Sequence, residues 1–252
     1  MNSLDYDEMY FKHDLFESPE NEETRIWRYI NFKKFVDLLE KRALFFSRAD
    51  KLSDQFEGSI PKPTIRTRKN ISDSISFDRS SQYTKAFKKV VLVNCWHMND
   101  FESDAMWKLY LKEANGVAIQ STFKNLVQCF DADTKNIVYI GKVNYIDYNI
   151  DSFQEGNIFQ PYIFKRKEFQ HERELRVITL YTDANVNKPD FLSKVFDFNG
   201  INIPVDLHIL IERVYICPNA RKGFFNLVKS IMREYALDIE PTKSSLEDEP
   251  QY

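Results

Sequence analysis

The stretch FKRKEFQHERELRVITL, residues 164–180, decides how the C-terminal half of this chain folds. Within it, Glu172, Glu174 and Arg176 recur at every second position, just before an apolar, β-branched run at residues 177–179. In a strand these three side chains would share one face, with two carboxylates beside a guanidinium. In a helix, Glu172 and Arg176 would form only an i,i+4 pair, worth about 0.2–0.5 kcal/mol. The β-branched residues favour the strand, at least from Glu174 onward.

Two neighbouring carboxylates repel each other, so they need either solvent or a cation close by. Arg176 can supply that cation, and this allows two interpretations of the same face. It is either a ladder of ion pairs that stabilises the fold, or the charged face of an active site. The residues of this segment leave both interpretations open.

The remaining predicted elements are short and mixed in type. Apolar and β-branched runs predict strands at residues 25–30, 44–47, 90–96, 116–122 and 208–218, and one long strand or a hairpin at 136–148. Helical spacing predicts helices at residues 31–43, 81–89, 102–115, 123–130 and 221–237. Asn31 and Ser103 are predicted to cap the N-termini of two of these helices. Residues 62–80 are rich in Ser, Arg and Asp, which predicts a surface excursion.

The order of these elements lacks the regular βαβ period of a doubly wound sheet. We therefore expect an α+β fold, in which a mixed, largely antiparallel sheet carries flanking helices in a single domain. No internal repeat or long linker divides the sequence. The predicted organisation is an acidic N-terminal arm at residues 1–24, one α+β domain at 25–246 and a polar tail at 247–252.

Composition narrows the class of protein. The 252 residues are 43% hydrophobic with a net charge of −3, which suits a soluble protein without general attraction to nucleic acid or an anionic membrane. The 6 glycines form neither GxGxxG nor GxxxxGK[ST], the usual phosphate-binding loops. Three widely spaced cysteines and the lack of any apolar run of ~20 residues predict a cytoplasmic protein with no membrane partner. Because the segment 61–90 is basic, nucleic acid stays open as a less favoured partner. The sequence does not indicate an oligomeric state.

Catalytic motifs are few. No HExxH, paired CxxC or GxSxG occurs, so we predict neither a metal site nor a Ser-His-Asp hydrolase. In LFFSRADKLSDQFEGS, residues 44–59, Ser47 ends a predicted strand, and Asp54 and Glu57 follow in a loop, where functional sites often form. The alternative is that Asp54 caps a turn and Glu57 is solvated.

Five segments, taken in order, resemble a bacterial family known only as domain of unknown function 2971. They are WRYI, LFFSRADKLSDQFEG, VNCWHMNDFESDAMWKLYLKEANGVAI, FKRKEFQHERELRV and IPVDLHILIERVYICPNA, and the resemblance covers residues 26–246. Asp54, Phe56 and Glu57 match an Asn-Asp-Pro-Phe-Glu-like segment of the family, although Ser53 and Gln55 replace its Asn and Pro. This resemblance implies little settled activity.

The order of Arg28 in WRYI, Ser47 in LFFS and Glu172-x-Glu174 also resembles ADP-ribosyltransferases. That resemblance implies an enzyme that uses NAD, with Glu174 as the catalytic carboxylate and with Glu172 and Arg176 supporting it. An arginine can hold the diphosphate of NAD through two parallel hydrogen bonds. A glutamate can stabilise the positive charge that develops on the ribose as nicotinamide leaves.

The leading expectation is therefore an ADP-ribosyltransferase-like toxin or phage-defence effector that acts on an unknown macromolecular target. The residues expected to bind NAD are Arg28, Ser47, Tyr29, Asp54 and Glu57. The hypothesis requires Arg28, Ser47 and Glu174 to face one cleft. Two other classes remain open: a non-enzymatic sensor or interaction module, and a metal-dependent nuclease or phosphoesterase. The carboxylates available to that metal enzyme would be Asp54, Glu57, Glu172 and Glu174.

Overall fold

The computed structural model describes residues 13–111, 115–130, 136–184, 186, 188 and 190–251. Residues 1–12 of the predicted arm and residue 252 of the predicted tail lie outside this part of the chain. Contacts group the residues into two compact units, and the domain bounds given above stay a prediction. The first unit comprises Met1–Ser18, Phe45–Asn94 and Lys135–Ile201, and the second comprises Pro19–Leu44, Cys95–Thr134 and Asn202–Tyr252.

The first unit contains strand β8 (Glu174–Leu180), which pairs antiparallel with β5 (Tyr139–Lys142). Six of the seven β8 residues are buried, so the strand belongs to the core of this unit. A separate pair, β6 (Asn144–Ile146) and β7 (Phe164–Arg166), runs parallel. Three strands belong to this unit only in part: β2 (Ala43–Arg48), β3 (Val91–Met98) and β9 (Gly200–Pro204). Strands β2 and β3 pair antiparallel at Ser47 and Val93, which lie within the first unit.

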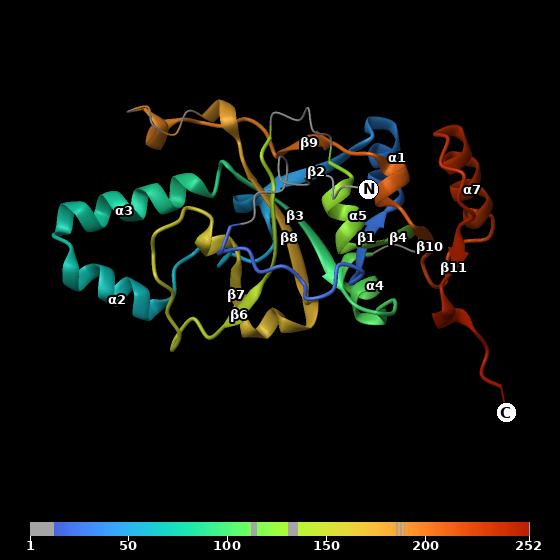
Figure 1. Cartoon of the computed structure of the whole chain (residues 1–252), viewed down its shortest axis with the longest axis horizontal. Coiled ribbons are helices and arrows are strands. Elements are labelled where there is room, and N and C mark those ends of the chain that lie inside the picture. The colour runs from blue at the N-terminus through green and yellow to red at the C-terminus, as the bar shows by residue number, and fades with distance from the viewer. Residues whose placement is uncertain are drawn as a thin grey trace, which may run out of the picture. The chain divides into compact units, whose positions relative to one another are not determined.

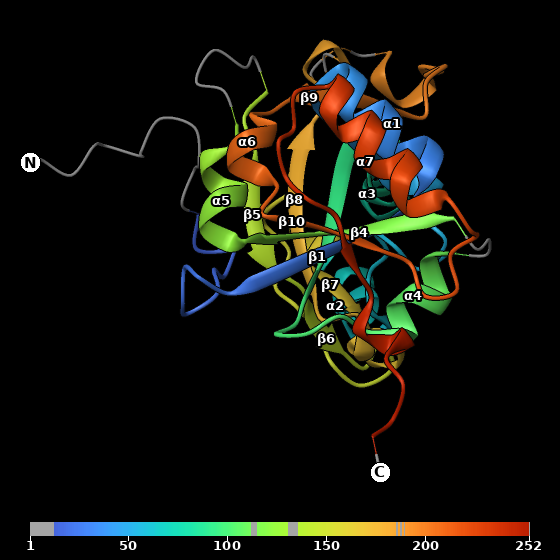
Figure 2. The same cartoon turned by 90° about the vertical axis from the view of Figure 1, so that its right-hand side faces the viewer.

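The second unit is centred on β4 (Gly116–Thr122), every residue of which is buried. On either side of β4 lie β1 (Arg25–Asn31) and β10 (Arg213–Ile216), both antiparallel to it, and β11 (Thr242–Lys243) runs parallel to β10. Helices α1 (Phe32–Lys41) and α7 (Phe224–Glu234) lie side by side (Figure 2). The rings of Phe32 and Phe224 pack edge to face between them, with centroids 5.3 Å apart.

The remaining elements are helical, and Figure 1 labels several of the α-helices among them. The α-helices are α2 (Lys62–Ile71), α3 (Ser74–Phe87), α4 (Asp104–Tyr110), α5 (Phe123–Gln128) and α6 (Leu207–Leu210). The 3-10 helices are η2 (Ala49–Lys51), η3 (Gln160–Tyr162), η4 (Lys167–Glu172), η5 (Thr182–Ala184), η6 (Phe191–Ser193) and η7 (Ser245–Glu247). The predicted α+β class, with a largely antiparallel sheet and flanking helices, is confirmed. Among the described residues, no helix is both long and apolar enough to cross a membrane.

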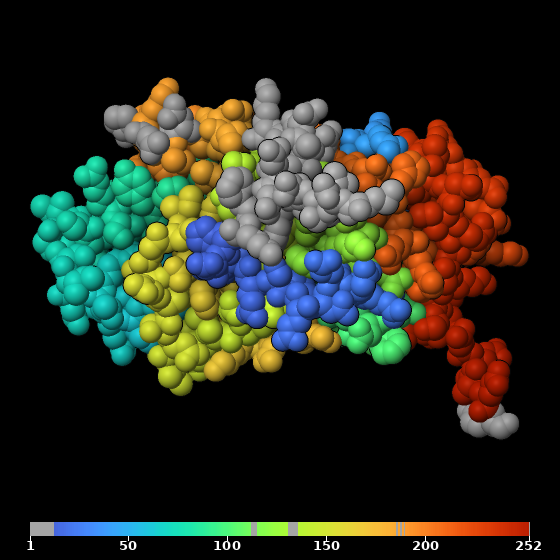
Figure 3. All heavy atoms as spheres, viewed as in Figure 1, coloured from blue at the N-terminus to red at the C-terminus, as the bar shows by residue number. Residues whose placement is uncertain are grey.

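Residues 62–80, predicted to form a surface excursion, are largely helical. This segment forms α2 and most of α3, whose atoms lie at the molecular surface (Figure 3). The apolar periodicity that normally reveals a helix is weak here, because α2 buries Thr64 and Arg68 instead of apolar residues. A local signal was present: Asp73 caps α3 by accepting a hydrogen bond from the backbone of Ser76 at 2.8 Å.

Two predicted strands also differ from the structure. Residues 136–148 form neither one strand nor a hairpin, because β5 pairs with β8 whereas β6 pairs with β7. In 208–218 the strand begins only at Arg213, because Asp206 caps the short helix α6 by accepting from the backbone of His208 at 2.8 Å. The partners and caps that decide these elements lie outside the segments themselves.

The predicted cap of α1 is confirmed and offers a test of local stability. Oδ1 of Asn31 accepts a hydrogen bond from the backbone of Lys34 at 2.9 Å. We expect Asn31→Ala to lower the free energy of unfolding by about 1 kcal/mol, because a helix-terminal N–H loses its acceptor. Urea unfolding would measure the loss. Asn31→Ser keeps an acceptor and should lose much less; an equal loss in both variants would rule out the capping role.

Candidate functional site

The charged segment that opened the sequence analysis contains a strand and a short helix. Strand β8 begins at Glu174, as predicted, but Glu172 ends helix η4, so its predicted place on the strand face is wrong. Arg173, between them, adopts a left-handed conformation with φ of 40°. This turn nevertheless brings the two carboxylates together, because both bind the same lysine, Lys165.

Arg176 lies at the centre of a buried ion network in the first unit. Its side chain is 1% exposed. Nε donates to Oε2 of Glu174 at 2.6 Å, and the two terminal nitrogens donate to the two oxygens of Glu57 at 2.5 and 3.0 Å. One of those nitrogens also donates to the backbone oxygen of Tyr162 at 2.6 Å. The guanidinium is therefore bonded on all three of its nitrogens.

Lys165 of β7 extends the network to the second carboxylate. Its Nζ donates to Oε1 of Glu174 at 2.6 Å and also to Oε2 of Glu172. Both oxygens of Glu174 are thus occupied, one by Lys165 and one by Arg176. The ring of Phe169 lies 4.6 Å from Nζ, and the hydroxyl of Tyr145 accepts from the backbone of Glu174 at 2.9 Å.

Asp54 and Glu57 have different roles. Asp54 accepts from the backbone of Phe56 at 3.0 Å, which confirms that it caps a turn, and it also pairs with Arg166 at 2.9 Å. Glu57 is 3% exposed, so the idea that it is solvated is wrong. It is the bidentate partner of Arg176.

The two carboxyl groups that share Lys165 have pKa values shifted in opposite directions. Burial, together with a hydrogen bond and the charge of Glu174, raises the pKa of Glu172 to about 8 against the attraction of Lys165. Burial opposes the charge on Glu174 as well. There, however, Arg176, a hydrogen bond from Glu172 and Lys165 together hold the pKa well below its usual range. The opposite directions of these two pKa shifts favour the proton on Glu172 and the ionised form of Glu174.

The other predicted site residues lie elsewhere. Ser47 is in the first unit, where its hydroxyl donates weakly to the backbone oxygen of Arg48 at 3.3 Å. Arg28 and Tyr29 belong to the second unit. Burial lowers the pKa of Arg28 to about 10, and its guanidinium lies 5.8 Å from the ring centre of Trp96. The hydroxyl of Tyr29 accepts from the backbone of Ser103 at 2.8 Å.

The first unit thus brings together Glu57, Glu172, Glu174 and Arg176. A shared cleft for Arg28, Ser47 and Glu174 stays a prediction. Among the described residues, no group of three or more His, Cys, Asp or Glu side chains could hold a metal ion. In the network, cationic side chains occupy the positions next to the carboxylates where a metal enzyme would need its ion.

Sequence reasoning missed Lys165, the cation that joins both carboxylates. Lys165 lies in a basic run, FKRK, which is typical of a solvated surface. The burial of this lysine depends on the pairing of β7 with β6, which no local sequence pattern predicts.

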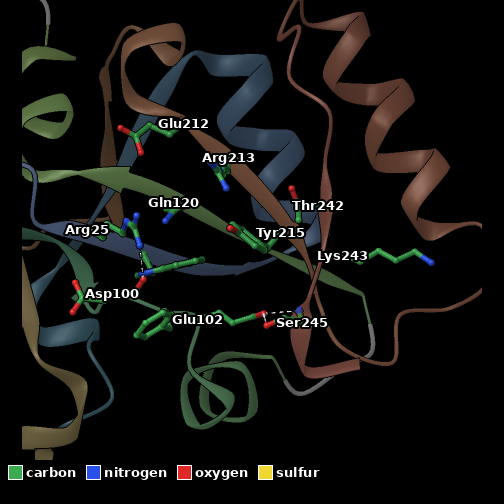
Figure 4. Close-up of a pocket in the computed structure, with 12 residues that line it drawn as sticks. Arg25, Asp100, Glu102, Gln120, Glu212, Arg213, Tyr215, Thr242, Lys243 and Ser245 are labelled. Atoms are coloured by element: carbon green, nitrogen blue, oxygen red, sulfur yellow. Dashed lines mark hydrogen bonds between the residues drawn. The ribbon is translucent and has the colours of Figure 1, made fainter. Parts of the chain in front are cut away.

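A second candidate site is a hollow of about 370 Å³ in the second unit (Figure 4). It contains charged, polar and aromatic side chains from β1, β4, β10, β11 and the segments beside them. The lining residues are Arg25, Trp27, Asp100, Phe101, Glu102, Gln120, Glu212, Arg213, Tyr215, Thr242, Lys243 and Ser245. Sequence reasoning did not find this hollow, because its strands are distant in the chain and meet only through pairing.

Comparisons with known proteins identify no relative of this chain. No family model matches the chain, and no curated protein or solved structure matches it significantly. The resemblances to domain of unknown function 2971 and to ADP-ribosyltransferases therefore stay predictions. Function has to be argued from the chemistry of the network and the hollow.

The proton on Glu172 predicts a pH dependence of stability. The folded state raises this pKa from an ordinary value of 4.5 to about 8, so it binds the proton more tightly than the unfolded chain does. The resulting stabilisation is complete below pH 4.5 and is lost as the pH rises through about 8. Glu172→Gln, which mimics the protonated acid, should make the unfolding free energy less dependent on pH over this window.

Urea unfolding of both proteins at a series of pH values would measure this difference. The exposed Glu168 offers a matched control, since Glu168→Gln should keep the wild-type pH profile. Parallel profiles for wild type and Glu172→Gln would contradict the assignment of the proton to Glu172.

Proposed function

We propose that this protein works by binding, as a sensor or interaction module, and that its ion network has a structural role. The observation that carries the proposal is the occupancy of Glu174. Both of its oxygens are held in ion pairs, and its side chain is 4% exposed. A carboxylate that is paired on both oxygens and shielded from solvent is poorly placed to contact a substrate.

The charges of the network balance internally. With the proton on Glu172, the cations Lys165 and Arg176 face the carboxylates Glu57 and Glu174. Balanced and hydrogen-bonded charges are the form in which buried ions are tolerated. This balance supports a structural network, since each buried charge has a compensating partner.

Catalysis by Glu174 would require these pairs to open. Removing one partner of a buried ion pair costs about 3–5 kcal/mol, because the other charge is left without compensation. An ADP-ribosyltransferase needs its glutamate in contact with the ribose of NAD at the moment when positive charge develops. The free energy that stabilises the closed network therefore opposes contact between the glutamate and the ribose.

The hollow in the second unit supports the binding role in the proposal. Binding sites are usually concave and combine apolar walls with a few polar groups that orient the ligand. The hollow has both kinds of lining, and its volume of about 370 Å³ lies within the usual range for small-molecule sites.

Replacement of Glu174 distinguishes a structural carboxylate from a catalytic one. We expect Glu174→Gln to lower the free energy of unfolding by about 3–5 kcal/mol, because Lys165 and Arg176 lose a shared counter-charge. We also expect the wild type to release no nicotinamide from labelled NAD, with or without cell lysate. Urea unfolding and a nicotinamide-release assay would measure the two effects.

Glu168→Gln is the matched control, because Glu168 is an exposed glutamate of the neighbouring helix η4. It should leave stability unchanged. Nicotinamide release by wild type and by Glu168→Gln, but not by a folded Glu174→Gln protein, would overturn the proposed function and favour the ADP-ribosyltransferase prediction.

A further inference from the structure

We propose that the hollow in the second unit binds a small aromatic molecule that carries a single anionic group. That chemistry is shared by mononucleotides, which carry a phosphate, and by aromatic carboxylates. The inference rests on the proposed function, since it names the class of ligand that the binding module would take. Three paired strands place the side chains that would hold this ligand on one face of the sheet.

The floor of the hollow is a row of side chains across β1, β4 and β10. Trp27 pairs with Gln120, and Gln120 pairs in turn with Arg213. Residues directly opposite each other on paired strands point to the same face of the sheet. Arg25 lies two residues before Trp27 and therefore projects from the same face of β1.

Two guanidinium groups approach this floor without a carboxylate partner. Among the described residues, neither Arg25 nor Arg213 forms an ion pair, and Arg25 donates one hydrogen bond, to the backbone oxygen of Asp100 at 3.0 Å. A guanidinium has five N–H donors in a planar fork that matches carboxylate and phosphate oxygens. The strands that carry these two arginines lie on either side of β4.

Gln120 supplies an independent indication of a ligand. The residue is 5% exposed, and its side-chain amide makes no hydrogen bond to any other residue in the part of the chain that the structure describes. Its amide atoms are not among the fully buried ones that lack a partner, so they reach the surface of the hollow and can hydrogen-bond to water or to a ligand there. In Figure 4 the Gln120 side chain lies between those of Arg25 and Arg213, where it could donate to the same anion.

Aromatic rings form the apolar part of the hollow. Trp27 and Tyr215 pack against each other with ring centroids 5.0 Å apart, and Phe101 is 75% exposed. A rigid aromatic face next to an arginine pair suits a ligand that is planar at one end and anionic at the other. Trp27 is also a natural fluorescent reporter within the site.

The acidic lining limits the charge of the ligand. Glu102 is already occupied by the hydroxyls of Ser244 and Ser245, at 2.7 and 2.8 Å, and by the indole N–H of Trp107 at 2.9 Å. The carboxylates of Asp100 and Glu212 also line the hollow and would repel a polyphosphate, although Glu212 accepts from the side-chain amide of Asn125 at 2.9 Å. Lys243 extends away from the other lining residues (Figure 4). One anionic group held by two arginines is therefore the best match.

Calorimetric titration at low salt would test the proposal with AMP, phenylacetate, adenosine and inorganic phosphate as probes. We expect AMP or phenylacetate to bind, and adenosine and inorganic phosphate to bind at least tenfold more weakly. Binding of AMP alone would identify a phosphate ligand, and binding of phenylacetate alone a carboxylate ligand. Failure of both to bind, or equal binding of adenosine, would overturn the proposal.

Variants then link binding to the hollow. Arg213→Gln and Gln120→Leu should each weaken the binding of the successful probe, Arg213→Gln by about ten- to hundredfold, since a hydrogen bond to a charged group is lost. Arg233→Gln, at an exposed arginine of α7, is the charge-matched control and should bind normally. Unchanged affinity in a folded Arg213→Gln protein would overturn the site. This outcome is separate from nicotinamide release, which tests the proposed function.

Discussion

The guanidinium of Arg176 is the constraint on which the first unit depends. It is almost fully buried, and a charge in that position must be matched by carboxylates and hydrogen-bond acceptors. Glu57 and Glu174 supply the charge, and the backbone of Tyr162 supplies a further acceptor. Three segments of the chain, which contain Glu57, Tyr162 and strand β8, must therefore come together before this arginine can be buried.

Such a network specifies a structure more strictly than apolar packing does. Apolar side chains tolerate small shifts, whereas a half-satisfied buried ion pair is worse than none. Lys165 adds a second requirement, because Glu174 can be shared by two cations only if β7 and β8 adopt the observed arrangement. The proton on Glu172 then removes the one negative charge that the two cations do not balance.

The two candidate sites differ in the state of their polar groups. In the ion network each charged side chain has a partner, which favours a role in stability. In the hollow Arg25, Gln120 and Arg213 leave donors available, which favours a role in binding. The contrast explains why the most conspicuous charge pattern in the sequence is not the best candidate for a ligand site.

The sequence by itself determined the α+β class, the strand from Glu174 onward and the caps at Asn31 and Ser103. These features follow from periodicity and from hydrogen bonds that span three or four residues, so a local pattern records them. Only the tertiary structure decided that Lys165 is buried and that Gln120 lies between Arg25 and Arg213. Those contacts depend on strand pairing over tens of residues, and the same side chains in another register would face solvent.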